Sequence, residues 1–107
     1  MKLTQVRKLA LALPEVTEEP HFDRTSFRIR GKIIATAIAD EPFLNIMASE
    51  PVREPALAMY PDALEKLYWG KKVCGVRVHL ENAESEMVAE LLEKTWKEKA
   101  PKSLVND

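Results

Sequence analysis

A histidine between acidic residues gives this sequence its clearest chance of chemistry. It lies in the segment Glu18-Glu19-Pro20-His21-Phe22-Asp23. A loop stiffened by the proline would hold the imidazole near Asp23, and such a pair can bind a metal ion or transfer a proton. We favour the alternative, in which the acids are solvated and His21 makes a structural hydrogen bond or packs against Phe22. If this segment is a ligand-binding loop, its candidate residues are His21 and Asp23. Trp69 is a third candidate, from the segment at residues 68–72, which mixes aromatic and basic residues.

Other patterns of catalysis and cofactor binding are missing from the sequence. The chain has three glycines, and they form no phosphate-binding loop. Cys74 is the only cysteine, and no Cys/His pair has the spacing of a zinc site. Cys74, His21 and His79 do not make a recognisable set of nucleophile, base and orienting group. A single cysteine in an expected strand is typical of a small buried apolar residue. We therefore expect a protein that is not an enzyme, uses no cofactor and holds no structural metal.

Basic residues gather in two stretches without a single acid, residues 24–39 and residues 66–80. The net charge of −1 hides this separation, because the acids collect in the loops and in residues 81–98. A cationic surface of this kind suits phosphate groups. The alternative is the solvated face that antiparallel sheets usually have. The candidate nucleic-acid contacts are Arg28, Arg30, Lys32, Lys71, Lys72 and Arg77.

The elements that must position these residues begin with an amphipathic helix over residues 4–13, capped by Thr4 and ended by Pro14. Residues 15–24 read as a polar loop. Alternating polar and apolar residues predict a hairpin, with strands over 26–30 and 33–39 joined by a Gly31-Lys32 turn.

Alternation in this hairpin predicts which side chains face the core. Phe27 and Ile29 would point inward, and Arg28 would pair with Ala35 and Arg30 with Ile33. The outer face of the sheet would then carry Arg28, Arg30, Ala35 and Ala37, joined by Arg77 and His79.

The second half of the chain predicts further strands and two helices. Strands are expected over 43–48 and 73–80, with a turn over 70–72. Residues 64–69 are ambiguous, and a short strand is one interpretation of them. Because prolines are best tolerated in the first turn, the middle helix is placed over 54–60. The last helix is capped by Asn82 or Ser85 and precedes Pro101. Its apolar stripe consists of Met87, Val88, Leu91, Leu92, Thr95 and Trp96.

These elements predict one α+β domain over residues 1–107. An antiparallel β-sheet would carry helices packed on one face, with helices at the N- and C-termini. The N-terminal residues do not resemble a secretory signal, and no apolar run is long enough to cross a bilayer. We expect a cytoplasmic monomer without membrane contact.

Several segments together resemble the MmcQ/YjbR family, and they occur in the same order along nearly the whole chain. They are Glu18-Glu19-Pro20-His21-Phe22, Ser26-Phe27-Arg28-Ile29-Arg30-Gly31-Lys32-Ile33, Trp69-Gly70-Lys71, and Trp96 with Ala100-Pro101-Lys102. The resemblance implies a CyaY/frataxin-like α+β sandwich and DNA binding through a double-wing arrangement of strands and loops. It implies no catalytic residue.

Two hypotheses about function follow. The first is a non-enzymatic binding protein of the MmcQ/YjbR type, with weak, sequence-indifferent DNA binding through the basic strands. The alternative is a small-ligand or protein-interaction module that uses the His21 loop and the outer face of the sheet. A steep salt dependence of DNA affinity would favour the first. A concave pocket near His21 would favour the second.

Overall fold

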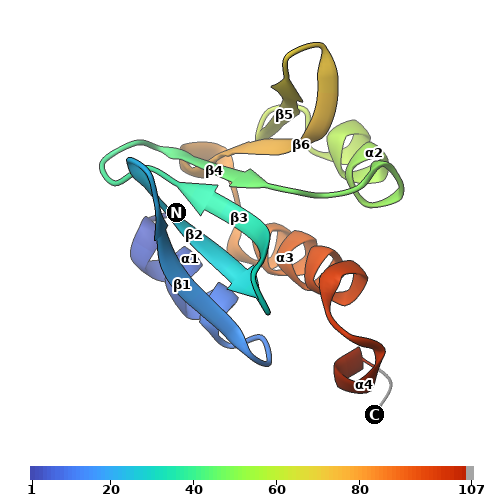
Figure 1. Ribbon diagram of the computed structural model, residues 1–107. Coiled ribbons are helices and arrows are strands. Elements are labelled where there is room, and N and C mark those ends of the chain that lie inside the picture. Colours follow the sequence, from blue (N-terminus) through green and yellow to red (C-terminus); the bar gives the residue numbers. More distant parts are fainter. Residues whose placement is uncertain (106–107) are drawn as a thin grey trace.

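The computed structural model describes residues 1–105, and this part of the chain contains a six-stranded antiparallel sheet (Figure 1). The strand order is β1-β2-β3-β4-β6-β5. The strands are β1 (Val16–His21), β2 (Arg24–Ile29), β3 (Lys32–Ala37), β4 (Phe43–Ile46), β5 (Leu64–Trp69) and β6 (Lys72–His79). The expected α+β class is confirmed, and the ambiguous residues 64–69 form a strand, β5.

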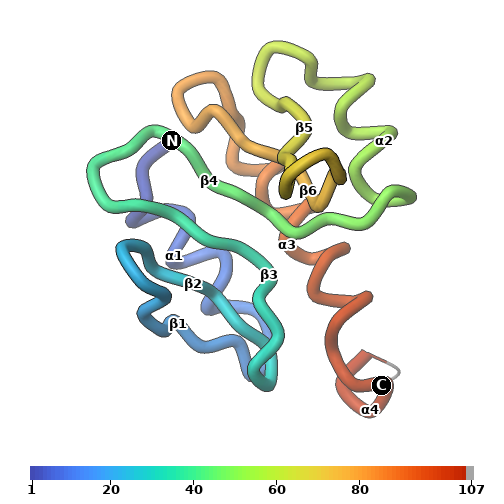
Figure 2. The backbone as a smooth tube through the Cα atoms, turned by 45° about the horizontal axis from the view of Figure 1, so that its top comes forward, coloured from blue at the N-terminus to red at the C-terminus, as the bar shows by residue number. Residues whose placement is uncertain are grey.

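Helices cover one side of this sheet. They are α1 (Leu3–Leu11), α2 (Glu50–Met59) and α3 (Ser85–Lys99). The short α4 (Lys102–Val105) follows α3 and lies away from the strands in Figure 1, and a 3-10 turn, η1 (Leu80–Asn82), follows β6. The N-terminal helix α1 packs on α3, and α3 contacts β3 and β4, while α2 contacts α3, β5 and β6 (Figures 1 and 2). Within residues 1–105, no helix is both long enough and apolar enough to span a lipid bilayer.

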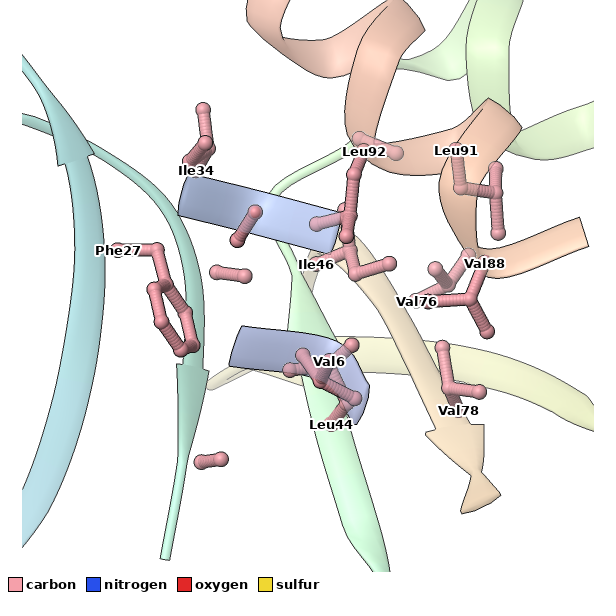
Figure 3. Close-up of a cluster of buried hydrophobic side chains, with 14 of the residues drawn as sticks. Val6, Phe27, Ile34, Leu44, Ile46, Val76, Val78, Val88, Leu91 and Leu92 are labelled. Atoms are coloured by element: carbon pink, nitrogen blue, oxygen red, sulfur yellow. The ribbon is translucent and has the colours of Figure 1, made fainter. Parts of the chain in front are cut away.

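The core lies between α1, α3 and the inner face of the sheet (Figure 3). The predicted stripe of α3 is confirmed, because all six of its side chains are buried. Phe27 and Ile29 of β2 are fully buried, as alternation predicted. The helix begins after Glu84 rather than at Asn82 or with Ser85 as its cap. The strand after β3 ends at Ile46, two residues earlier than expected.

The predicted first residues of two helices, α1 and α2, were wrong. The first helix begins at Leu3 because the backbone N–H of Lys2 donates to Gln5 Oε1 at 2.8 Å, so Thr4 is inside the helix. The middle helix begins at Glu50 rather than 54. Pro51 fits its first turn, where backbone N–H groups have no partner within the helix, and Pro55 is accepted inside at the loss of one hydrogen bond.

The polar loop predicted over residues 15–24 is wrong, because residues 16–21 form the edge strand β1. Its register with β2 runs from the Val16–Ile29 pair to the His21–Arg24 pair. Pro20 lies within this strand. Proline is tolerated there because only one side of an edge strand pairs with a neighbour.

The predicted pairing between β2 and β3 is also wrong. Phe27 faces Ala35 and Arg28 faces Ile33, so Ile34 is an extra residue in a β-bulge. Because the bulge shifts the alternation, Ala35 is fully buried on the core side, and so is Ala37, with 3% of its surface exposed.

The turn between β2 and β3 consists of Arg30 and Gly31 rather than Gly31 and Lys32. Both have positive φ, 47° and 83°, as a type I′ turn requires. Arg30 therefore leaves the face of the sheet, and its guanidinium pairs with Glu15 at 3.0 Å.

Candidate functional site

The face of the sheet turned away from α1 and α3, here called the outer face, is hollowed into a groove of about 610 Å³. Its floor includes Thr36, Asn45 and Arg77 from three neighbouring strands. The β1–β2 turn lines it with Phe22, and the β5–β6 hairpin lines it with Trp69. In Figure 1 the end of that hairpin rises away from the other strands. The groove is thus a concave surface between two hairpin ends.

A row of polar side chains crosses the sheet at the floor of this groove. The strand register places Ser26 opposite Thr36, Thr36 opposite Asn45 and Asn45 opposite Arg77. Arg77 Nε lies 3.5 Å from Asn45 Oδ1, and its guanidinium lies 5.5 Å from the ring centroid of Phe43. The predicted outward position of Arg77 on β6 is confirmed, since its neighbours in the strand are fully buried.

Thr36 is the member of this row whose hydrogen bonding is incomplete. Its side chain is 4% exposed, and its Oγ1 has no hydrogen-bond partner. Buried hydroxyl groups are nearly always hydrogen-bonded, because losing water without a replacement costs free energy. The row at the groove floor therefore contains a covered hydroxyl group that lacks a hydrogen-bond partner.

His21 is held by Arg28 at the edge of the groove. Arg28 Nη2 lies 3.2 Å from His21 Nδ1, and Arg28 Nε donates to Ser26 Oγ at 2.8 Å. A guanidinium has only donors, so Nδ1 accepts and the proton of a neutral imidazole lies on Nε2. His21 also packs edge-on against Phe22, with ring centroids 4.9 Å apart. Arg28 thus supports His21 and is only half-exposed.

The β1–β2 turn presents Phe22 to solvent in an unfavourable backbone conformation. Its side chain is 94% exposed, and its φ is 58°, in the left-handed region that bulky residues avoid. Burial does not compensate this strain, so the conformation points to a role outside the core. Trp69, at the other rim, is 82% exposed. Two large aromatic side chains are therefore available to a ligand.

Replacing Phe22 by glycine is expected to raise the free energy of unfolding by about 0.5–1 kcal/mol, because glycine adopts positive φ without steric cost. Urea denaturation measures the change. Phe22→Ala is the matched control, since alanine also loses the ring but keeps the strain. Equal stability of the glycine and alanine variants would contradict this account of the turn.

The other predicted site residues are divided between the two ends of the sheet. Asp23 lines the groove beside Arg24, 3.6 Å from its Nε. Lys71 and Lys72 lie at the exposed end of the β5–β6 hairpin, where Lys72 pairs with Trp69 in the register. Arg30 and Lys32 lie at the β2–β3 turn, at the same end of the strands as the end of the β5–β6 hairpin, with β4 between the two hairpins.

The environments of these cations differ. The Arg30–Glu15 contact raises the pKa of Arg30 and lowers that of Glu15, both through a side-chain hydrogen bond. Within residues 1–105, Lys32, Lys71 and Lys72 take part in no ion pair. The lysines beside Trp69 are thus free to meet an anion.

Glu18, from the acidic segment singled out in the sequence, is committed elsewhere. Its carboxylate accepts two hydrogen bonds from Arg7 of α1, at 2.7 and 3.0 Å, and one from Thr25 at 2.7 Å. The hydrogen bond from Arg7 is the main reason that the pKa of Glu18 is lowered, with a smaller contribution from Thr25. The Glu18–Arg7 ion pair therefore links β1 to α1. Among the described residues, no group of three His, Cys, Asp or Glu is placed to hold a metal ion.

Sequence reasoning missed four groove residues as candidates for binding: Phe22, Arg24, Thr36 and Asn45. A signal was present, because Thr36 and Asn45 are polar residues inside otherwise apolar strand segments. Phe22 gave no such signal, since its exposure follows from the turn that ends β1.

Comparison with known proteins gives one family. The family model described as YjbR matches residues 11–98, a range that contains all six strands and nearly all of α3. Neither a curated protein nor a solved structure matches the chain.

Proposed function

Because the chain belongs to the YjbR family, we propose that it is a non-enzymatic, cytoplasmic binding protein that holds DNA in the groove on its outer face. The observation that carries this proposal is the combination of exposed aromatic rims, Phe22 and Trp69, with two arginines, Arg24 and Arg77, around one groove. Aromatic side chains beside cations are the usual components of surfaces that hold nucleic acid without reading its sequence.

The charges around the groove favour weak binding. Arg24 and Arg77 line it, but Asp23 offsets part of their charge. Lys71 and Lys72 add positive charge at the end of the β5–β6 hairpin. Few phosphates can therefore be neutralised, and we expect dissociation constants of about 1 μM or higher at physiological salt.

The side chains of the groove support binding rather than catalysis. His21 Nδ1 is occupied by Arg28, and the carboxylate of Asp23 is largely solvated. Cys74 lines the groove, but neither histidine is hydrogen-bonded to it. A nucleophile with an oriented base would be required for covalent catalysis.

Fluorescence anisotropy with a labelled DNA oligonucleotide, over about 20–200 mM NaCl, tests the proposal. The variant Arg24→Ala/Arg77→Ala is expected to bind about tenfold more weakly and to lower the slope of log affinity against log salt by about 1.5–2. The groove, not the β2–β3 turn, is the site, so Arg30→Ala should leave affinity unchanged.

A charge-matched control separates local contacts from net charge. Lys8→Ala/Lys97→Ala removes two positive charges from α1 and α3, on the opposite side of the sheet, and should bind almost like the wild type. Absence of binding by the wild type at about 20 mM salt would refute the proposal. An equal loss in both double variants would also refute it.

The groove near His21 favours a second candidate, a small-ligand or protein-interaction module at the same surface. Its volume of about 610 Å³ lies in the range of small-molecule sites. A small ligand would bind with little dependence on salt, in contrast to a strand with several phosphates.

A further inference from the structure

We propose that the groove receives unpaired nucleotides of a single DNA strand rather than duplex DNA. One base would stack on the rim aromatics, and its polar edge would meet Thr36 and Asn45. This inference rests on the proposed function, since it specifies the form of nucleic acid that the same groove holds.

The first argument is the unsatisfied hydroxyl of Thr36. Thr36 lines the groove and is 4% exposed, and its Oγ1 is covered and has no hydrogen-bond partner. The side chain would have to rotate for Oγ1 to meet a base. Asn45 Oδ1 lies 3.5 Å from Arg77 Nε, and within residues 1–105 the Asn45 amide nitrogen donates no side-chain hydrogen bond, so its N–H groups can donate to a ligand. The Thr36 hydroxyl can donate or accept a hydrogen bond, and the Asn45 amide can donate one. Together they complement the donors and acceptors on the Watson–Crick edge of any base. A paired base would offer these groups much less, because its Watson–Crick edge is already bonded.

The second argument is the position of the aromatic side chains. Phe22 and Trp69 are more than four-fifths exposed, at opposite rims of the groove. A stacking contact needs the open face of a base, which a duplex hides between neighbouring base pairs. Base stacking on one aromatic side chain changes affinity by about 5–150-fold in single-strand binding proteins. Only a single strand would use these two rings.

The third argument is charge. A duplex is held mainly through its phosphates, which requires many free cations. The groove is lined by two arginines, of which Arg24 lies beside Asp23, and Arg77 is partly engaged by Asn45 and Phe43. Stacking and base-edge hydrogen bonds therefore contribute more than phosphate contacts, which favours the single strand.

The test compares labelled dT12 with the dT12·dA12 duplex by anisotropy at about 50 mM NaCl. We expect the single strand to bind at least about tenfold more tightly. Unlabelled dT12 should quench the fluorescence of Trp69, while Trp96 contributes a constant background because it is 5% exposed and bonded to the carbonyl of Pro14. Trp69→Leu should abolish the quenching and weaken binding about tenfold.

Thr36→Val tests the hydroxyl with nearly no change of shape. Binding of dT12 should weaken about 3–10-fold, which corresponds to one hydrogen bond. The urea midpoint should stay the same or rise, because no internal hydrogen bond is lost. Thr95→Val is the matched control: Thr95 Oγ1 is also buried without a partner, but it lies on α3, on the other side of the sheet. Its binding should be unchanged.

The outcomes separate the two proposals. Equal affinities for single strand and duplex, with unchanged Trp69 fluorescence, would overturn the single-strand inference and leave DNA binding in place. Thymidine monophosphate binding as tightly as dT12 would also overturn it and favour the small-ligand candidate. Failure of both DNA forms to bind at about 20 mM salt would remove the proposed function as well.

Discussion

Replacing Leu91 by alanine is expected to lower the free energy of unfolding by about 2–5 kcal/mol. Leu91 is 3% exposed and belongs to the buried cluster drawn in Figure 3, where α3 covers the sheet. The truncation removes apolar surface from the core and leaves a cavity, because the surrounding β-sheet can collapse only partly. Urea denaturation followed by circular dichroism measures the loss.

A leucine at a helix end provides the control. Leu11, the last residue of α1, is 44% exposed, so Leu11→Ala should cost less than about 1 kcal/mol. A loss below about half a kilocalorie per mole for Leu91→Ala would mean that α3 does not pack its apolar stripe on the sheet.

Replacing Gly75 by alanine is expected to destabilise the protein by about 3 kcal/mol. Alanine in a strand is usually favoured over glycine by about 0.5–1 kcal/mol, so the expected sign depends on the surroundings. A Cβ at this position would overlap the carbonyl oxygen of Ile46 and lie 3.1 Å from Met47 Cα. These are backbone atoms of the neighbouring chain segment, and they cannot move without disturbing the β4–β6 ladder.

Gly31→Ala is the matched control, measured in the same denaturation experiment. A Cβ there would meet nothing within 4 Å, and only the positive φ of 83° is unfavourable, so the cost should be about 1 kcal/mol. A neutral or stabilising Gly75→Ala would show that β6 does not approach β4 as closely as described.

Long periodic segments were predictable from sequence because their local pattern and their burial agree. The six-residue stripe of α3 extends over three turns. A small error in the predicted first or last residue of this helix therefore leaves the same side chains on its buried face. The alternation of Phe27 and Ile29 similarly determined which face of β2 is apolar. Short or proline-containing segments were not predictable in this way. Pro20 suggests a loop, yet its strand forms because β2 offers a complete antiparallel partner.

The candidate site was predictable in part. His21, Asp23, Trp69 and Arg77 line or border one groove. Arg30 and Lys32 do not line it, because the β2–β3 turn consists of Arg30 and Gly31, one residue earlier than expected, and Arg30 pairs with Glu15.

The sequence by itself determined the α+β class, the apolar face of α3 and the separation of basic strands from acidic helix, since each depends on residue order along one element. The tertiary structure alone decided that Thr36, Asn45 and Arg77 form one row, and that Phe22 and Trp69 flank it. Such neighbours come from strands distant in the chain, and their register depends on bulges and turns. A one-residue shift in register exchanges the two faces of a strand. The groove therefore exists only once the whole sheet has paired.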